Sequence, residues 1–404
     1  MKNLPLEGIK VVELATFAAA PMASMCLADW GADVIKVEPL NGDAMRNFGK
    51  FMKCIVQDDD NIQFELGNRN KRGISIDLKS PLGMEILQKL LSNADVFVTN
   101  MRTNALKKLN LDYKSLSSKY VKLIFAHING YGDFGPDKDK PGFDVAAYFA
   151  RAGILIEFPN KGADPLSPVA GFGDHTTGTF LAGGICAALY GRVRTGRGCK
   201  LQTSLYNAAL WNLSLDIASA SQNGYFPLQG SRVKPRSAVV NTYKTKDDHW
   251  ITVILLEYDR YIKQFFETVL KKPELANDER FNNQVNSFQH SAELTSIIDE
   301  VFNGLTLAEC VERLRKADIV HEINRRWHEI KDDPQALENG YLMEIKMPSG
   351  RTDWVVGNFA KFDDENTVIR RSSPRLGEHN LEVLAELGYS KVDIADFKKN
   401  KIIK

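Results

Sequence analysis

The sequence predicts an α/β protein in two parts, the larger of which is built on a parallel β-sheet. Two strand-like runs, 10–15 and 33–37, are separated by a helix of small residues that ends at Trp30 and Gly31. A strand, a helix and a second strand within about thirty residues are how a parallel sheet begins. Near 224 the composition changes, and the short strands and amphipathic helices that follow indicate a smaller α+β domain.

The turn after the first strand argues against a dinucleotide cofactor. A nicotinamide or flavin site would place the pattern G-x-G-x-x-G there. This chain has Phe17-Ala18-Ala19-Ala20-Pro21 instead. We therefore predict a Rossmann-like sheet that binds neither cofactor.

Further strands continue the sheet, with helices between them. The expected elements are the strands 73–76, 95–99 and 122–128 and the helices 82–91 and 113–118. Ligands of such sheets gather beyond the carboxyl ends of the strands. The segments that follow these strands, 77–79, 100–102 and 129–132, are polar and basic, and Lys107 and Lys108 come soon after. Their convergence at one sheet edge would suit a phosphate-bearing ligand.

A glycine-rich stretch, Gly171-Phe172-Gly173-Asp174-His175, joins a Pro-rich loop to a run of small and apolar residues with helical spacing. We therefore expect Asp174 at or just before a helix start. The residues alone leave two interpretations open. Asp174 is either an N-cap residue, a position that favours Asp strongly, or a carboxylate nucleophile that the helix dipole keeps ionised and that forms an acyl intermediate.

The second half of the chain has a linker and two hairpins. The expected elements are a helix at 145–150, a strand at 200–202, a long helix at 204–221, a linker at 224–237, a hairpin of 239–243 with 250–254, a hairpin around Pro348-Ser349-Gly350 and a helix that ends at Leu387. Asp332-Asp333-Pro334 marks a second boundary. The predicted domain limits are thus 1–223, 224–331 and 332–404.

The composition excludes several classes of protein. The 404 residues carry a formal net charge of +1, so no electrostatic reason exists to expect a nucleic-acid or membrane partner. Five cysteines stand without a CxxC pair, which argues against a zinc site or a disulfide framework and fits a reducing compartment. The N-terminus has no apolar signal region, and no window reaches the ~18 apolar residues of a membrane span. We therefore expect a cytoplasmic protein without a metal.

Seven motifs stand in a specific order along the chain. They are Leu6-x-Gly8-x-Lys10-Val11-Val12, Ala20-Pro21, Gly31-Ala32-Asp33-Val34-Ile35-Lys36-Val37-Glu38 with Gly42-Asp43 and Arg46, Asn70-Lys71-Arg72, Gly130-Tyr131-Gly132, Gly173-Asp174, and Leu376-Gly377-Glu378-His379. The ordered set resembles the class III CoA-transferases, the family of formyl-CoA transferase and carnitine CoA-transferase. Within that family, Gly171-Phe172-Gly173-Asp174-His175 and Lys140-Pro141-Gly142-Phe143-Asp144 resemble the (R)-2-hydroxyacyl-CoA transferases of amino-acid-fermenting anaerobes.

The resemblance implies a fold and an activity. The fold would be an interlocked homodimer, in which 1–223 and 332–404 form a Rossmann-like large domain and 224–331 the small one. The activity would be transfer of CoA from an acyl-CoA to a free carboxylic acid, such as 2-hydroxyisocaproate or an aryl-lactate, with coenzyme A as substrate and no metal. Asp174 would be the nucleophile and would form an aspartyl-CoA thioester.

The resemblance also implies site residues. The CoA contacts would be Ala18, Ala19, Ile76, Lys79, Asn100, Met101, Arg102, Lys108, Asn129 and Tyr131. His175, Phe143 and Tyr148 are candidates to contact the acid, although His175 equally suits a side chain that points away and the two aromatic residues equally suit a core. His127 fits a packed core histidine.

Two positions and one missing glycine run depart from the family pattern. Pro39 and Asn129 stand where some relatives have Arg and Lys, which puts phosphate contacts there in doubt. The chain also lacks the run of glycines that closes the site of formyl-CoA transferase. Either 230–237 replaces it or the lid is built differently.

Two other functions remain open. An acyl-CoA racemase or epimerase of the same fold would use a His in a Gly-His-Asp segment, which corresponds here to Gly142-Phe143-Asp144. Phenylalanine cannot exchange a proton, so that interpretation lacks its base. A non-catalytic CoA-binding relative is the second alternative, and Asp174 argues against it.

Overall fold

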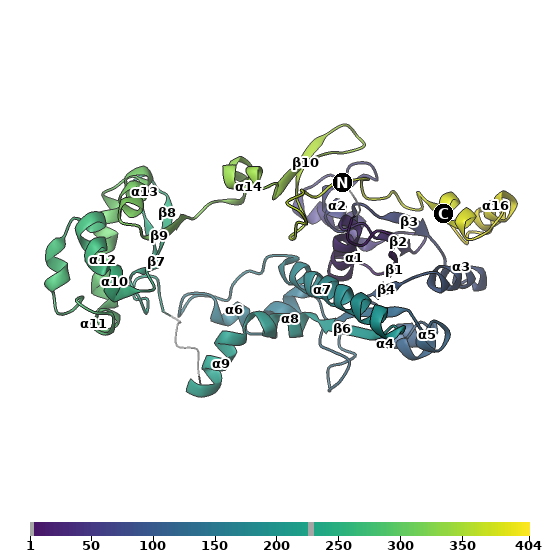
Figure 1. The fold of residues 1–404 in the computed structure, drawn as a ribbon, viewed down its shortest axis with the longest axis horizontal. Helices are drawn as coiled ribbons and strands as arrows, with labels where there is room; N and C mark the ends of the chain where they lie inside the picture. Colours follow the sequence, from purple (N-terminus) through teal and green to yellow (C-terminus); the bar gives the residue numbers. More distant parts are fainter. Residues whose placement is uncertain (1–3, 225–229) are drawn as a thin grey trace. The chain divides into compact units, whose positions relative to one another are not determined.

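The computed structural model describes residues 4–224 and 230–404 and divides the chain into two compact units (Figure 1). The large unit takes Met1–Ile154, Pro168–Leu213 and Pro334–Lys404, and the small unit takes Leu155–Ser167 and Ser214–Asp333. The domain limits expected from the sequence stay a prediction. Part of the expected linker, 225–229, lies outside the described residues. No helix among the described residues is long and apolar enough to cross a membrane.

A six-stranded parallel sheet forms the centre of the large unit. Its strands are β1 Lys10–Leu14, β2 Asp33–Glu38, β3 Arg72–Ser75, β4 Val96–Thr99, β5 Ile124–Asn129 and β6 Lys200–Ser204. They lie in the order β3-β2-β1-β4-β5-β6, with every neighbouring pair parallel. The predicted strands are confirmed, with small differences at their ends. The strand order reverses between β1 and β4, and in open α/β sheets ligands bind at that point.

The large unit also contains helices. They are α1 Ala19–Asp29, η1 Ala44–Met52, α2 Ile62–Asn68, α3 Pro81–Ser92, α4 Thr103–Lys108, α5 Tyr113–Lys119, η2 Val145–Ala150, α7 Phe172–Thr195, α8 Leu205–Asn212, α14 Pro334–Glu338, α15 Asn380–Glu386 and α16 Lys391–Lys399, while α6 Ile154–Glu157 spans the limit between the units. Buried side chains of α3, α15 and α16, among them Leu87, Val383 and Phe397, form one core with Val12 and Phe97 of the sheet.

Helices α1 and α7 pack closely against each other. A Cβ atom at Gly178 of α7 would lie 2.6 Å from the carbonyl oxygen of Ala19 and 2.8 Å from the Cβ of Met22. Only glycine fits at this approach, because real Cβ atoms do not come so near to backbone. This contact fixes the first turns of the two helices beside each other.

Two helical predictions need correction. The helix expected at 204–221 is two helices, α8 and α9 Ser214–Asn223, and the break at Leu213 lies where the chain passes from the large to the small unit. The side-chain amide of Asn212 donates to the Tyr148 hydroxyl at 2.7 Å and ties down the end of α8. The helix at 145–150 has π-type geometry rather than α.

The C-terminal segment covers the free edge of the sheet at β3. The N–H of Gly73 donates to Nδ1 of His379 at 3.1 Å, and the N–H of Ser75 donates to Oδ1 of Asn380 at 2.9 Å. Side chains therefore satisfy the edge donors that a further strand would otherwise take. The hairpin of β10 Leu342–Lys346 and β11 Thr352–Val356, expected around Pro348-Ser349-Gly350, is confirmed.

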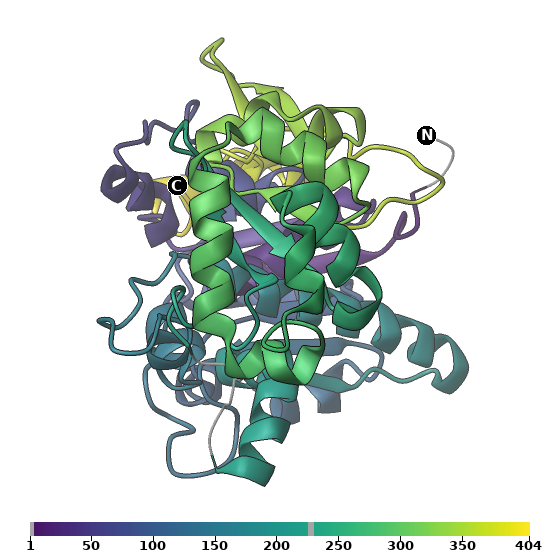
Figure 2. The ribbon, with the colours of Figure 1, turned by 90° about the vertical axis from the view of Figure 1, so that its left-hand side faces the viewer.

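The small unit is an antiparallel sheet with helices. The strands β7 Val240–Lys244, β8 Trp250–Ile254 and β9 Val320–Ile323 pair in that order, which confirms the predicted hairpin of β7 and β8. The helices are α9, α10 Tyr258–Gln264, η3 Phe265–Leu270, η4 Pro273–Asn277, α11 Gln284–Gln289, α12 Ser291–Asn303, α13 Leu307–Lys316 and η5 Trp327–Asp332. Buried aromatic residues, including Phe265, Phe266 and Phe302, join the helices that Figure 2 shows in green to the sheet.

A cluster of buried charges lies at the carboxyl ends of β1 and β2. The ammonium group of Lys36 donates to Glu13 at 2.8 Å and to Asp43 at 2.9 Å, while Lys71 donates to the second oxygen of Glu13 at 2.6 Å. All four side chains are buried. The two ammonium groups hold the pKa of Glu13 at about 2 despite its burial, whereas burial lowers the pKa of Lys71 to about 8. Among the described residues, Lys71 has no other carboxylate partner than Glu13, and Lys36 shares its charge between Glu13 and Asp43.

Replacement of Glu13 by Gln is expected to destabilise the protein by about 3–5 kcal/mol, since two buried ammonium groups lose their shared carboxylate. Urea denaturation at pH 7 measures the effect. The control is Glu85→Gln, which removes an exposed carboxylate paired with Lys89 and is expected to cost less than about 1 kcal/mol. Equal losses in the two variants would contradict the role given to the buried cluster.

Candidate active site

A cavity of about 600 Å³ opens beyond the carboxyl ends of β1, β4 and β5. Its wall is formed by the loops that follow these strands, by the segment 138–145 and by the first turn of α7. All of these residues belong to the large unit. The cavity therefore occupies the place at which the strand order reverses.

Asp174 lies on the first turn of α7 and lines this cavity. The helix begins at Phe172, and Gly171 takes the N-cap position with a φ of +80°, a conformation that glycine adopts at little cost. The N-cap interpretation of Asp174 is therefore wrong. In the described part of the chain no backbone hydrogen bond contributes to the pKa of Asp174, and the residue lines the cavity.

Burial opposes the effect that the helix dipole is expected to have on the charge of Asp174. Burial, with a smaller contribution from the neighbouring carboxylate of Asp144, raises the pKa of Asp174 to about 7. Loss of hydration disfavours the charged form more strongly than the helix N-terminus favours it. Near neutral pH the side chain therefore exchanges readily between its acid and carboxylate forms.

Asp144, directly before η2, is a second acid at this wall. It is 6 % exposed, and neither of its oxygens has a hydrogen-bond partner of good geometry among the described residues. Burial raises its pKa to about 6, an effect that the backbone N–H groups of Gly171 and Gly173 oppose. The N–H groups of both glycines therefore interact with Asp144. For this reason we do not assign them as donors to a negatively charged oxygen of a reaction intermediate.

Gly173 has no room for a side chain. A Cβ atom there would lie 2.3 Å from Oδ1 of Asp144 and 2.3 Å from Cγ of Tyr148. The glycine brings the backbone beside Asp174 against the buried Asp144 and Tyr148. A similar approach joins Gly130 and Gly142, where a Cβ on Gly130 would lie 2.8 Å from the Cα of Gly142.

His175 and Phe143, two candidates for contact with the acid, also line the cavity. Nδ1 of His175 lies 2.6 Å from the carbonyl oxygen of Gly171 and donates its proton to it, which leaves Nε2 as an acceptor. Burial lowers the pKa of His175, so the neutral ring prevails at pH 7. Phe143 is 64 % exposed and packs edge-to-face against Phe17 at 5.7 Å.

Five of the expected CoA-contact residues line the cavity, namely Ala18, Ala19, Asn100, Arg102 and Asn129. Asn100 uses its amide to join two loops, since its Nδ2 donates to the Thr16 carbonyl and its Oδ1 accepts from the Thr16 N–H. Asn129 likewise donates to Asp133 at 2.8 Å and accepts from the N–H of Gly132 at 2.6 Å. Both amides shape the wall through these internal bonds.

The remaining expected residues do not line the cavity. Ile76 is 1 % exposed and packs into the core of the large unit, because strand alternation turns it away from the site. Tyr148 is 1 % exposed and lies beneath Gly173, so it contributes to the core rather than to the wall. His127 is buried, with Nε2 at 2.9 Å from the carbonyl oxygen of Met101, which confirms it as a packed histidine.

Three polar or basic candidates lie elsewhere on the large unit. Lys79 is exposed in the loop after β3, and Lys108 is exposed at the end of α4. The ring of Tyr131 is flanked by the cationic groups of Lys140 and Arg151 at 5.3 and 5.6 Å. Their contact with a ligand stays a prediction.

Sequence analysis missed two groups of cavity residues. Lys138 and Lys140 line the cavity with Arg102 and give it a basic side. The Asp-Lys-Asp-Lys-Pro run at 137–141 was a signal that could have found them. The second group is apolar and consists of Met22, Met45, Phe48, Phe51 and Leu66. Met45, Phe48 and Phe51 recur every three residues, the period of the 3-10 helix η1 that carries them, and this spacing was the signal that could have found them.

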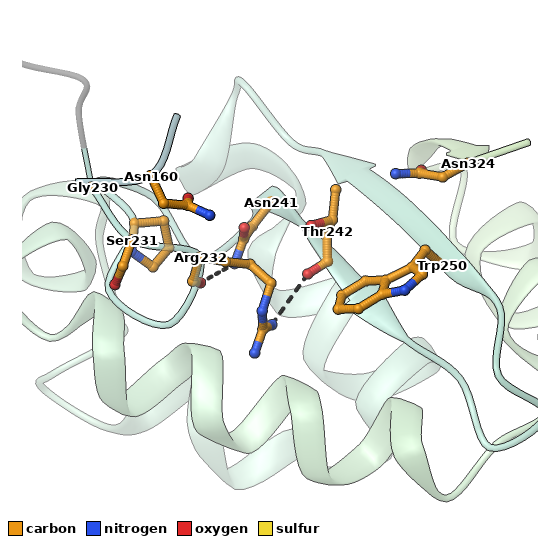
Figure 3. A pocket seen from close by; sticks show the side chains of 9 residues that line it. Asn160, Gly230, Ser231, Arg232, Asn241, Thr242, Trp250 and Asn324 are labelled. Carbon is orange, nitrogen blue, oxygen red and sulfur yellow. Dashed lines mark hydrogen bonds between the residues drawn. The ribbon is translucent and has the colours of Figure 1, made fainter. Parts of the chain in front are cut away.

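A second cavity, of about 340 Å³, lies in the small unit (Figure 3). It is lined by residues that include Gly230, Ser231 and Arg232, from the segment considered as a lid. Arg232 forms a bidentate ion pair with Asp299 at 2.9 Å and donates to the carbonyl oxygen of Thr242, as Figure 3 shows for the latter bond. Its charge is thus already neutralised. The described residues that line this cavity include no carboxylate, histidine or cysteine.

Comparison with known proteins identifies the family. The model of CoA-transferase family III matches residues 6–380. The chain belongs to this family. A solved structure of a CaiB/BaiF family protein from Brucella suis superposes with a TM-score of 0.83 at 29 % identity, covering 96 % of this chain and all of the other. The chain thus has the sequence of a family III CoA-transferase and the fold of a CaiB/BaiF family protein.

Two characterised relatives are similar over nearly their whole length. The (R)-2-hydroxy-4-methylpentanoate CoA-transferase of Clostridioides difficile is 41 % identical, with 99 % of each chain covered. The cinnamoyl-CoA:phenyllactate CoA-transferase of Clostridium sporogenes is 38 % identical, with 98 % of this chain and 96 % of that protein covered. This CoA-transferase therefore groups with enzymes named for 2-hydroxy acids. Its described residues include no cluster of acidic, histidine or cysteine side chains that could hold a metal ion.

Replacement of Gly173 by Ala is expected to lower transferase activity by about a hundredfold, because the new methyl group displaces Asp144 or the first turn of α7. Steady-state rates measure this loss. Gly191→Ala is the control on the same helix, where a Cβ atom would meet nothing within 4 Å, and it should keep its activity. An active Gly173→Ala enzyme would show that the close contact of Gly173 with Asp144 and Tyr148 is not needed for activity.

Proposed function

We propose that this enzyme transfers CoA from an acyl-CoA to a free (R)-2-hydroxy acid, such as 2-hydroxyisocaproate or an aryl-lactate, through an aspartyl-CoA thioester on Asp174. The observation that carries the proposal is the carboxylate of Asp174 in the wall of the 600 Å³ cavity, without a capping role. The two relatives named for 2-hydroxy acids support the substrate class.

The reaction begins at the thioester carbonyl of the donor. A carboxylate oxygen of Asp174 attacks this carbon, the C–S bond breaks, and CoA leaves as a thiolate. The product is a mixed anhydride. The thiolate then attacks the aspartyl carbonyl, which forms the enzyme-CoA thioester and releases the donor acid as a carboxylate.

The acceptor completes the cycle by the reverse steps. Its carboxylate attacks the aspartyl thioester and expels CoA thiolate, and the thiolate then attacks the acceptor carbonyl of the new anhydride. The acceptor acyl-CoA forms and Asp174 regains its carboxylate. Each step exchanges one activated carbonyl for another, so the sequence needs neither ATP nor a metal.

The oxyanions of these steps need N–H donors, and the start of α1 can supply them. Ala18 and Ala19 line the cavity, and the first N–H groups of a helix have no partner within it. Phe17, directly before them, has a φ of +61° and donates its own N–H to Asp43 at 3.0 Å. This bond holds the loop so that the start of α1 borders the cavity.

The cavity wall suits the two parts of the substrate. The apolar side, with Met22, Phe48 and Phe143, matches an isobutyl or benzyl group. Arg102 and Lys140 lie on the basic side and would pair with the phosphates of CoA. Nε2 of His175, as a neutral acceptor, would take the hydrogen bond of a 2-hydroxyl group.

The racemase alternative is disfavoured at the same wall. Phe143 lines the cavity at the position where a racemase would need a proton-exchanging side chain. No other described residue of the segment 142–144 offers an imidazole. The CoA-transferase interpretation needs only the carboxylate of Asp174.

Asp174→Asn should lose at least about a thousandfold of the transferase activity and all covalent adduct, since an amide is a poor nucleophile. Purified enzyme is incubated with 4-methylpentanoyl-, 2-hydroxyisocaproyl- or cinnamoyl-CoA, quenched, and analysed by intact mass and by peptide mapping after hydroxylamine trapping. In the wild type we expect a CoA or acyl adduct, or a hydroxamate, at Asp174. The ranking of adduct yields among the thioesters reports the substrate preference.

The matched control is Asp139→Asn, which removes a different carboxylate from the same cavity. Oδ1 of Asp139 accepts from Asn104 at 3.2 Å, and the variant should still form the adduct. Turnover by Asp174→Asn near the wild-type rate would refute the aspartyl mechanism. Absence of any adduct in the wild type, with every thioester, would favour a non-catalytic CoA-binding protein.

We further propose that two chains form a homodimer, interlocked as the family resemblance implies. The support is the exposure of large apolar side chains on α7 and α8, where Tyr190, Val193 and Trp211 are 70, 81 and 72 % exposed. A second copy of the chain would cover them.

Light scattering after gel filtration is expected to give twice the mass of one chain. Val193→Asp should reduce the dimer fraction, because the new carboxylate would lose its hydration in an apolar interface. The control Val392→Asp makes the same change on α16, where the valine is 71 % exposed, and should remain dimeric. A wild-type protein with the mass of one chain would refute the dimer.

A further inference from the structure

The wall of the cavity carries two acids, and their pKa values show no effect of a nearby cation that would stabilise their negative charge. Asp174 has Asp144 as the one neighbouring charge that shifts its pKa among the described residues. Asp144 in turn is only 6 % exposed, and both of its carboxylate oxygens lack a hydrogen-bond partner of good geometry in the described part of the chain. A buried carboxylate without a cation is costly and calls for an explanation.

The approach of these two acids is built into the backbone. Gly173 lies next to Asp174 in the chain, and a Cβ on it would fall 2.3 Å from Oδ1 of Asp144. Tyr148, on the same segment as Asp144, packs on the other side of this Cβ position and is held by its bond from Asn212. The acids therefore cannot separate without movement of η2 or α7.

Other charged groups at the cavity do not neutralise the pair. Arg102, Lys138, Asp139 and Lys140 line the same cavity from the loops after β4 and β5. None of them contributes to the pKa shift of either acid. His175, the titratable neighbour on α7, donates to the Gly171 carbonyl and is neutral at pH 7.

We propose that Asp144 is a positioning residue whose negative charge drives the acylation of Asp174 by repulsion. The proposal rests on the proposed function, because it concerns the covalent step on Asp174. Asp144 itself forms no bond with the substrate.

The negative charge of Asp174 leaves its site during the reaction. Before attack, the two neighbouring sites hold two negative charges when both acids are ionised. Once Asp174 has attacked the thioester, its oxygen is part of a neutral anhydride, and its charge has passed to the CoA thiolate. After the thiolate has formed the aspartyl thioester, the released donor acid carries the charge into solution. Asp144 then remains as the single anion at the start of α7, a helix terminus that favours one negative charge.

The same repulsion acts on protonation and on acylation. Both remove the charge of Asp174, so whatever Asp144 adds to the pKa of Asp174 it also adds to the stability of the acyl-enzyme. A pKa contribution of one unit corresponds to a tenfold larger equilibrium fraction of adduct. The same repulsion from Asp144 thus destabilises the ionised form of Asp174 and favours the adduct over it.

The sign of the pH dependence follows from the nucleophile being the carboxylate. A raised pKa means that the rate of adduct formation increases with pH as Asp174 loses its proton. Burial and Asp144 together put the pKa near 7. Removal of the charge of Asp144 should move the midpoint to lower pH.

The experiment measures the rate and final yield of the Asp174 adduct between pH 4.5 and pH 8.5, by rapid quench and intact mass. The wild-type rate should rise with a midpoint near pH 7. In Asp144→Asn, which keeps the size of the side chain, the midpoint should fall by about one pH unit and the adduct fraction at pH 8 by about tenfold. Asp144→Glu, which restores the charge, should return the midpoint toward the wild-type value.

The control is Glu65→Gln, which removes another buried carboxylate of the large unit. Oε1 of Glu65 lacks a partner in the described structure and burial raises its pKa, but the residue does not line the cavity. This variant should keep the wild-type midpoint and yield. A general loss of stability would affect both variants, whereas the proposed role shifts only the Asp144 variant.

Failure of the inference and failure of the proposed function are distinguishable. No adduct in the wild type would refute the function itself. A wild-type adduct with an unchanged midpoint and yield in Asp144→Asn would overturn only the role of Asp144. If Asp144→Asn does not fold, the wild-type profile and Asp144→Glu still decide, since a wild-type midpoint near pH 4 would overturn the proposal.

Discussion

The ion pairs that Glu13 makes with Lys36 and Lys71 are the interaction on which the large unit depends. They join β1, β2 and the segment before β3 at one point, and Asp43 adds the loop after β2 through Lys36. Such a buried cluster contributes little net stability, since the attraction mainly offsets lost hydration. Its effect is to fix geometry, because each charge tolerates only arrangements in which its partners stay in contact.

This fixed geometry continues directly into the cavity. Asp43, held by Lys36, accepts the N–H groups of Phe17 and Met45 at 3.0 and 2.9 Å. Phe17 is thereby kept in a left-handed conformation and meets Phe143 across the wall. The start of α1 and the segment before η2 consequently face each other beside Asp174. A charge cluster away from the reacting carboxylate thus determines the shape of the space in front of it.

The sequence predicted the sheet well because buried runs and turn signals are local properties. It also directed attention to Asp174, since small residues and helical spacing surround it in the chain. The ionisation of that residue was out of reach, because it depends on burial and, to a smaller extent, on Asp144, which is distant in sequence and close only after folding. Asn100 and Asn129 line the cavity, as their place after strands suggested, whereas the bonds of their amides to neighbouring loops arise only on folding. Ile76 packs into the core of the large unit, which its place after a strand did not reveal.

The covering of β3 by His379 and Asn380 has a consequence for the order in which the chain becomes native during synthesis. The strands of the large sheet up to β6 leave the ribosome well before residue 379. Until then the donors of Gly73 and Ser75 have no side-chain acceptors, and the outer strand offers an open edge to other nascent chains. The small unit is made in this interval. The large unit can therefore be completed only after the small unit has been synthesised. During this interval its unfinished sheet is exposed to chaperones and to intermolecular strand pairing.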